Sequence, residues 1–266
     1  MNLLFFDVDD TIIDETGYIP LSTISAIRAL RGQGDLCFVN TGRPFSHIDR
    51  RVKAVGFDGF ICSCGQHIVY QGRVLLHAGF SREDSVRIAE TVRACHLNAL
   101  YEAESGIWLD FNDVIPSIVE SDRRRFESSG LRTSGSIEDE DFCFDKFCVF
   151  QSSSCDFQPL KDLIRGTCTM IDRGHGGFYE CILKGYSKAS GIEFIRNLLQ
   201  VSRENCYAFG DSTNDLSMLK AVPHSVAMGG SPSIVKEACE FTTDSLSEDG
   251  ILHALHHYGL IVPARF

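Results

Sequence analysis

The sequence predicts an α/β protein, with a Rossmann-like doubly wound parallel sheet as its core and an inserted α+β domain. Three observations lead to this prediction. Short apolar segments alternate with amphipathic helical patterns at both ends of the chain, which is typical of a parallel sheet covered on both faces. The middle of the chain instead has one helical pattern followed by extended segments. Polar residues, many of them acidic, follow the apolar segments at the two ends.

The first quarter of the chain alternates strand and helix signals. Four apolar residues in a row, Leu3–Phe6, predict a buried strand, and Leu36–Val39 and Phe60–Ser63 predict two more. Between them, Ser22–Arg31 has apolar residues at helical spacing and stops at a glycine. We also expect Pro44–Val55 to be helical, because a glycine follows it.

The last third repeats the alternation. The expected elements are a helix over Lys188–Gln200, a strand over Cys206–Phe209, a helix over Asp215–Ala221 and a strand over Ser225–Met228. Ser231 and Pro232 then have the chemistry of an N-cap and a first helical position. The histidines of "HALHH", residues 253–257, are interpreted as a solvated face of the last helix, because no fourth metal ligand is evident.

The middle of the chain predicts the inserted domain. Ser81–His96 is expected to be a helix opened by a serine cap. Extended segments are expected at Ile107–Phe111, Phe142–Gln151, Thr167–Asp172 and Phe178–Leu183. The loop "RGHGG" joins two strand-like runs and does not open a helix, so we interpret it as a hairpin turn and not as a phosphate loop. We therefore expect a core at residues 1–79 and 186–266, and an inserted domain at 80–185.

Composition narrows the class of protein. The 266 residues carry 25 Lys and Arg against 36 Asp and Glu, a formal net charge of −11. This balance argues against a nucleic-acid partner and against a membrane contact made by charge. No apolar run approaches the ~20 residues of a membrane-spanning helix. The cysteines are scattered and odd in number, 11 in all, which favours reduced thiols in a cytoplasmic protein.

Three carboxylates lie directly after the first expected strand, in "FFDVDDT". Asp7, Asp9 and Asp10 fall within four positions, so their charges repel, and a buried carboxylate is costly unless something neutralises it. The cluster is therefore either a solvated turn or a group built around a cation. Ligands of parallel sheets bind beyond the carboxyl ends of the strands, which is where this cluster is expected.

Other polar residues are expected at the same edge of the sheet. Asn40, Thr41, Gly42 and Arg43 follow the second strand. The segment "GDSTND", which contains Asp211, Asn214 and Asp215, follows the strand at Cys206, and Lys188 opens the helix before that strand. Carboxylates from two separate strands, a hydroxyl and a lysine would then gather at one edge.

These residues carry a resemblance to a known family. "FFDVDDT" resembles the first motif of the haloacid dehalogenase superfamily of phosphohydrolases, "VNTGR" its second motif, Lys188 its third and "GDSTNDLSML" its fourth. The tail "VAMGGSPSIVKEAC" resembles the Cof-type subfamily, which has a large α/β cap domain. The four motifs occur in order and at suitable spacing.

The resemblance implies a Mg²⁺-dependent phosphatase acting on small phosphorylated metabolites, most plausibly sugar phosphates. Asp7 would be the nucleophile that forms an aspartyl-phosphate. Asp7 and Asp211 would hold the Mg²⁺ with their carboxylates and Asp9 with its backbone carbonyl, and Asp215 would be either a further ligand or an acceptor for a group that holds the ion. The side chain of Asp9 would act as general acid and then as general base.

The resemblance also implies the phosphate contacts. Thr41 and Lys188 would bind the transferring phosphoryl oxygens, with Gly42 and Arg43 beside them, and Asn214 would orient Lys188 or the phosphate. Two other functions remain open. A phosphomutase would use the same aspartyl-phosphate, and a receiver-type signalling module would share the acidic cluster, although such modules are about half this length.

The sequence departs from the family pattern at three points. Asp10 stands where the family most often has glycine, Gln66 follows a Cys-Gly where Asn-Gly-Ala is common, and Gly230 replaces a frequent asparagine. Thr11 is expected to steady the turn around Asp7. In the inserted domain, the candidates for contact with substrate are Trp108, Arg173, His175 and Glu180.

Overall fold

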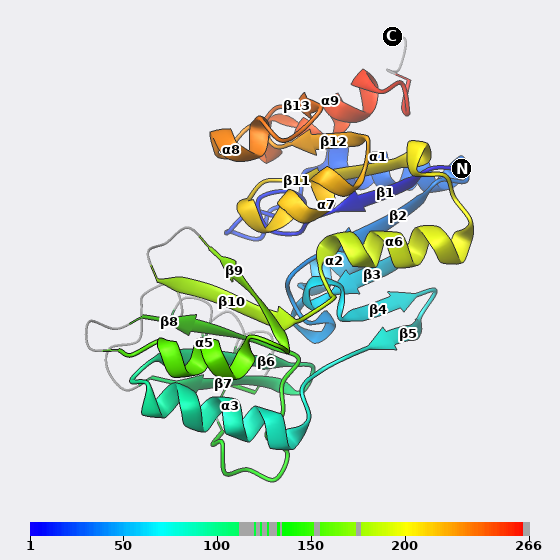
Figure 1. Ribbon diagram of the computed structural model, residues 1–266. Coiled ribbons are helices and arrows are strands. Elements are labelled where there is room, and N and C mark those ends of the chain that lie inside the picture. Colours follow the sequence, from blue (N-terminus) through cyan, green and yellow to red (C-terminus); the bar gives the residue numbers. More distant parts are fainter. Residues whose placement is uncertain are drawn as a thin grey trace. The chain divides into compact units, whose positions relative to one another are not determined.

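The structure is a computed structural model that describes residues 1–111, 120, 123, 127, 132–133, 135–151, 155–173 and 177–262. The chain divides into two compact units. The first unit comprises Met1–Gly42, Ile48–Leu76 and Ser187–Phe266, and the second comprises Arg43–His47 and His77–Tyr186. Both ends of the chain therefore build the first unit (Figure 1).

An eight-stranded sheet forms the centre of the first unit. Its strands lie in the order β13-β12-β11-β1-β2-β3-β4-β5. The bounds are β1 Leu3–Phe6, β2 Leu36–Asn40, β3 Gly59–Cys62, β4 His67–Tyr70, β5 Arg73–His77, β11 Cys206–Gly210, β12 His224–Ala227 and β13 Phe241–Thr242. The strands from β13 to β3 run parallel, and β4 is antiparallel to β3. The central strand β1 thus lies between β11 and β2, and its last residues share an edge with theirs.

Helices cover both faces of this sheet (Figure 1). They are α1 Leu21–Gly32, α2 Arg50–Val55, α6 Lys188–Leu199, α7 Leu216–Ala221, α8 Ser233–Lys236 and α9 Gly250–His257. Ile192 and Ile195 of α6 and Met218 of α7 join Leu3 and Phe5 of β1 in one buried core cluster. On burial, each such side chain contributes about 1.5–3 kcal/mol, so this packing holds α6 against the end of β1.

Most elements expected in the first unit are confirmed, and three details are wrong. Pro44–Val55 is not one helix, because the side chain of Asp49 accepts a hydrogen bond from the backbone of Arg51 and starts α2 afresh. Pro232 is itself the residue before α8, with no side-chain cap from Ser231. The hairpin of β4 and β5 is not expected from the sequence, since its turn is Gln71–Gly72 and not one of the Asn-Gly or Asp-Gly pairs that mark such turns.

The second unit is built on an antiparallel sheet with the strand order β7-β6-β8-β10-β9. The bounds are β6 Asn98–Ala103, β7 Gly106–Asp110, β8 Lys146–Phe150, β9 Cys168–Asp172 and β10 Phe178–Leu183, with helices α3 Arg82–Ala94 and α5 Gln158–Ile164. The side chain of Ser81 caps α3 as expected. β9 and β10 pair as a hairpin, as predicted for "RGHGG", although residues 174–176 lie outside the described residues.

An aromatic cluster fills the core of the second unit. Its largest members are Phe80, Tyr101, Trp108, Phe142, Phe144 and Phe147. The strand β6 and the helix α5 are not expected from the sequence, and the extended segment at Phe142–Gln151 shortens to β8. With a parallel sheet in one unit and an antiparallel sheet in the other, the predicted fold class is confirmed.

Candidate active site

The acidic cluster begins where β1 ends. Asp7 directly follows the strand, is 4% exposed, and donates its backbone N–H to the carbonyl of Phe209 at 2.9 Å. This bond continues the pairing of β1 with β11, so it fixes the backbone of Asp7 beside the end of β11. The two segments that carry the carboxylates are thereby held together by the sheet itself.

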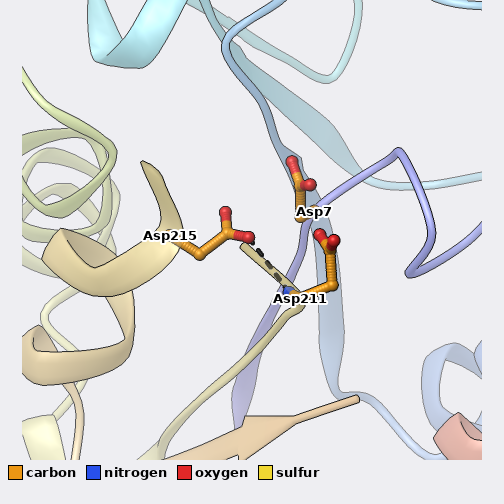
Figure 2. A group of neighbouring side chains, drawn as sticks. All are labelled: Asp7, Asp211 and Asp215. Atoms are coloured by element: carbon orange, nitrogen blue, oxygen red, sulfur yellow. Dashed lines mark hydrogen bonds between the residues drawn. The ribbon is translucent and has the colours of Figure 1, made fainter. Parts of the chain in front are cut away.

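Asp211 and Asp215 come from the loop that follows β11. One carboxylate oxygen of Asp215 accepts the backbone N–H groups of Asp211 and Ser212, each at 3.0 Å. Figure 2 shows the bond from Asp211. This contact folds the loop back on itself. Gly210 makes the turn possible, because a Cβ there would lie 2.7 Å from the Cγ of Asp215. Glycine is therefore required at the end of β11.

The three aspartates form one group. Carboxylate oxygens of Asp7, Asp211 and Asp215 all lie within 4.8 Å of one another, and Figure 2 shows the three side chains converging. Oxygen ligands of this kind suit a hard cation such as Mg²⁺ or Ca²⁺ and not a soft one. The donor set thus fits a divalent cation.

Lys188 lies against this group. Its Nζ is 2.6 Å from Oδ1 of Asp7 and 2.5 Å from Oδ1 of Asp215, and the side chain is 1% exposed. The lysine is the first residue of α6, where Ser187 and Ser190 form a reciprocal capping box. A buried ammonium is therefore paired with two buried carboxylates.

The charges shift the pKa values of the group. Burial, and then the charge of Asp215, raise the pKa of Asp7 to about 7 against the opposing effect of Lys188. Burial and the charges of Asp7 and Asp215 raise the pKa of Asp211 to about 9. Burial would lower the pKa of Lys188, but the two carboxylates that it contacts raise it above its ordinary value. The site therefore has more negative charge than one lysine can balance.

The turn after Asp7 is held by its backbone. The N–H groups of Ile12 and Ile13 both donate to the carbonyl of Val8, and Asp10 donates to Ile13. Asp9 lies in this turn beyond the end of β1, partly buried, and its charge contributes to the raised pKa of Asp7. The buried hydroxyl of Thr11 makes no hydrogen bond within the described residues.

Asp10 adopts a backbone conformation that explains the family preference at this position. Its φ is +53°, in the left-handed region that glycine enters without cost and that aspartate tolerates better than most residues. The side chain is exposed and lines a pocket of about 290 Å³ together with Asp14, Asp211 and Gly230. The extra carboxylate of Asp10 thus fits the turn, and Gly230 lines the same pocket.

The residues after β2 are divided between the two units. Thr41 is 1% exposed and Gly42 follows it in the first unit. Arg43 begins the stretch that belongs to the second unit, where its charge acts on the pKa of His47. Asn40, for which the sequence indicates no role, is fully buried and donates its side-chain amide to the backbone carbonyl of Lys188 at 3.0 Å.

Asn214 and Gln66 lie in the loops around the group. The side-chain oxygen of Asn214 accepts a 2.5 Å hydrogen bond from the hydroxyl of Ser212. Among the residues that the structure describes, the side-chain partners of Lys188 are Asp7 and Asp215 and not Asn214. Gln66 is fully buried, just after the left-handed segment Ser63–Gly65.

In the second unit, three of the four candidates for substrate contact lie among the described residues. Trp108 is 2% exposed in the aromatic core, with its ring edge-on to Phe142, so its placement toward a substrate is wrong. Glu180 is buried and pairs with Lys146 at 2.6 Å and with Arg173 at 3.2 Å. His175 lies outside the described residues.

The histidines of α9 lie on an exposed face, as interpreted from the sequence, with His253 and His257 exposed and His256 half-buried. Nδ1 of His253 is 2.7 Å from a carboxylate oxygen of Asp244, and the ring of His257 stacks on Phe241. In the part of the chain that the structure describes, no helix is both long and apolar enough to cross a membrane.

Comparison with known proteins decides the family. The model of the haloacid dehalogenase-like hydrolases matches residues 4–255, which is nearly the whole chain. The chain belongs to the haloacid dehalogenase-like hydrolase family. This confirms the resemblance drawn from the four motifs, and it places the aspartate group and Lys188 in the part of the chain that the family shares.

Relatives within the family are phosphatases. The chain is 40% identical over 273 residues to the 5-amino-6-(5-phospho-D-ribitylamino)uracil phosphatase YitU of Bacillus subtilis (strain 168), covering 96% of this chain and 97% of YitU. It is 28% identical over 260 residues to YkrA of the same organism, a protein named provisionally as a phosphatase, covering 97% of this chain and 98% of YkrA.

A solved structure has the same fold over the full length. The haloacid dehalogenase subclass IIB sugar phosphatase BT4131 superposes with a TM-score of 0.78 at 26% identity, covering 98% of this chain and 100% of that one. Family, relatives and fold together make this chain a phosphoric monoester hydrolase that acts on small phosphate substrates.

Proposed function

We propose that this haloacid dehalogenase-like hydrolase is a Mg²⁺-dependent phosphatase that hydrolyses phosphate esters of sugars or sugar-like polyols through an aspartyl-phosphate. The observation that carries the proposal is the contact of one buried lysine with two aspartates of a three-carboxylate group. Such a group has an anionic nucleophile and a fixed cation for the phosphoryl oxygens in the same place.

The group fits a divalent cation. Asp7, Asp211 and Asp215, with the backbone carbonyl of Asp9, would hold the Mg²⁺. When bound, the ion screens the repulsion between the Asp7 carboxylate and a phosphate dianion. The raised pKa values of Asp7 and Asp211 support this assignment, because a site with uncompensated carboxylates favours a bound cation.

The proposed reaction assigns a step to each of these residues. A carboxylate oxygen of Asp7 attacks phosphorus, the bond from phosphorus to the alcohol oxygen breaks, and Asp9 gives that oxygen its proton. Water then attacks the aspartyl-phosphate and gives a proton to Asp9, and inorganic phosphate leaves while Asp7 is restored. Lys188 and Thr41 bind the phosphoryl oxygens, on which negative charge is spread in the transition state. Gly42, Arg43 and Asn214 complete the proposed phosphate contacts.

The second unit is proposed to be the cap domain, with approximate limits of 80 and 185, that selects the alcohol part of the substrate. Its chain is inserted between the two halves of the first unit. The substrate class is supported by BT4131, which is a sugar phosphatase. We assign the protein to the cytoplasm, since all eleven cysteines are free thiols.

A second candidate substrate is favoured by one relative. YitU, at 40% identity, acts on 5-amino-6-(5-phospho-D-ribitylamino)uracil, whose phosphate sits on a ribityl chain. That compound and the sugar phosphates share a phosphorylated polyol, so the same phosphate site serves both. The uracil ring would then be an additional group for the cap domain to bind.

A phosphatase screen tests the proposal. Sugar phosphates, nucleotides and 5-amino-6-(5-phospho-D-ribitylamino)uracil are incubated with the protein and Mg²⁺, and released phosphate is measured, with Asp7→Asn as the blank. Continuous release that needs Mg²⁺ and Asp7 supports the proposal. Transfer of phosphate within a sugar without release would identify a phosphomutase, and no turnover of any ester would refute the assignment.

A further inference from the structure

Lys188 occupies a position in its helix that is unfavourable for a positively charged side chain. It is the first residue of α6, at the helix N-terminus, where the backbone dipole carries partial positive charge. A cation there is unfavourable. Its side chain is nevertheless buried between Asp7 and Asp215. Contacts from outside α6 must therefore hold this turn in place.

Asn40 makes one such contact. Its side-chain amide donates to the carbonyl of Lys188 at 3.0 Å, and both residues are buried, Asn40 fully and Lys188 to 1% exposure. Asn40 is the last residue of β2 and directly precedes Thr41. The hydrogen bond therefore ties the end of β2, with its phosphate-binding threonine, to the first turn of α6.

The segment Ser63–Gly65 makes a second contact with the same turn. All three residues have positive φ, at +48°, +54° and +90°. A Cβ on Gly65 would lie 2.3 Å from the carbonyl oxygen of Ser187, and the N–H of Cys64 donates to the carbonyl of Thr41 at 3.1 Å. The segment thus touches the residue before Lys188 on one side and Thr41 on the other.

We propose that Asn40 and Gly65 are positioning residues that set the separation of Lys188 from Thr41, and so shape the pocket for the transferring phosphoryl group. The inference rests on the proposed function. A left-handed backbone is strained at Ser63 and Cys64, and such strain persists where the surrounding contacts require it. Here the contacts that maintain the strained segment are made with Thr41 and with Ser187, the residue before Lys188.

The test compares three variants with the wild type. Asn40→Leu keeps the branched shape of the side chain, with a somewhat larger volume, and removes the donor. Gly65→Ala places a methyl group against Ser187. Gly56→Ala is the matched control, because Gly56 has φ +99° after α2 and its Cβ would meet only Arg31 at 3.4 Å. All three are assayed for kcat and KM with an aryl phosphate and Mg²⁺. Their Tm is measured with and without inorganic phosphate.

We expect kcat to fall at least tenfold in Asn40→Leu and Gly65→Ala, since a displacement of about 1 Å costs up to ~10²-fold. Inorganic phosphate should raise their Tm less than it raises that of the wild type. Gly56→Ala should lose stability yet keep kcat and the phosphate shift. The KM of the aryl phosphate should rise less than kcat falls, because the lysine contacts strengthen in the transition state.

Each outcome bears on the inference. If Asn40→Leu and Gly65→Ala fold and keep kcat within twofold, it is wrong. If neither variant folds while Gly56→Ala does, the contacts are structural and the inference is also wrong. Asn40→Asp, which keeps the shape of the side chain without the donor, checks that result. A wild type that releases no phosphate from any ester would instead refute the proposed function.

Discussion

Replacement of Asp211 by asparagine should stabilise the metal-free protein. The carboxyl has its pKa raised from 3.8 to about 9 by burial and by Asp7 and Asp215. The unfolded chain releases this proton near pH 3.8, whereas the folded protein keeps it up to about pH 9. The unfolded state therefore binds fewer protons between these values, and the stability of the metal-free protein falls as the pH rises through them.

The magnitude follows from the size of the interval. At pH 8 the carboxyl is about four pH units above its unfolded pKa, and each unit corresponds to about 1.4 kcal/mol, so the penalty reaches about 6 kcal/mol. An asparagine removes this penalty but leaves a partly buried amide, which costs about 1–3 kcal/mol if unpaired. Asp211→Asn should thus gain about 3–5 kcal/mol in the free energy of unfolding at pH 8.

Urea unfolding with EDTA at pH 5 and pH 8 measures the effect. The gain should be clearly smaller at pH 5, where the interval is about one unit. With Mg²⁺ the order should reverse, because the wild type is stabilised by RT ln(1 + [Mg²⁺]/Kd) and the variant lacks a ligand. Glu204→Gln, at an exposed carboxylate, is the control and should stay within about 0.5 kcal/mol. A variant less stable than the wild type in EDTA at pH 8 would refute this balance of charges.

Three further predictions concern single side chains. Lys188→Met should abolish phosphate release and destabilise the protein by about 3–5 kcal/mol in EDTA, because it leaves two buried carboxylates unpaired. Partial recovery of the Tm by Mg²⁺ in a thermal scan would support this prediction, and full activity would contradict it. Gln200→Gly should raise the free energy of unfolding by about 1 kcal/mol with unchanged kcat, since Gln200 ends α6 at φ +55°; a lower Tm would contradict it. Burial lowers the pKa of His47 to about 3, so the wild type should lose stability as the pH falls from 6.5 toward 3. In acid unfolding, His47→Phe should lose less stability than the wild type over this range.

The sequence predicts the first unit well because its signals are local. Leu3–Phe6 is apolar throughout, as a strand buried on both faces must be, and it forms β1 without a change of bounds. Lys188–Gln200 shows helical spacing, and α6 forms over Lys188–Leu199, one residue shorter than predicted. Parallel strands end at the same edge of a sheet, so the polar residues that follow them lie at that edge. The sequence alone is therefore enough to predict that Asp7 and Asp211 lie together.

The contacts that the sequence does not predict depend on tertiary structure. Asn40 is 148 positions from the carbonyl that it contacts, and no local pattern connects them. Trp108 is a misleading candidate for substrate contact because an aromatic residue serves equally in a core and in a site, and only the packing of Phe142 against it shows which. Asp49 interrupts a helix because its side chain can bond the local backbone, an effect that apolar periodicity does not record.

The contacts of Lys188 give it an electrostatic role beside the proposed binding of phosphate. Asp7 and Asp215 each contact its Nζ, so the lysine lowers the pKa of Asp7 and keeps part of the proposed nucleophile ionised near neutral pH. A divalent cation at Asp211 would complete the balance that one lysine leaves unfinished. With both cations in place, the lysine and a divalent ion, the acidic cluster at the end of β1 would be neutralised more fully than by the lysine alone.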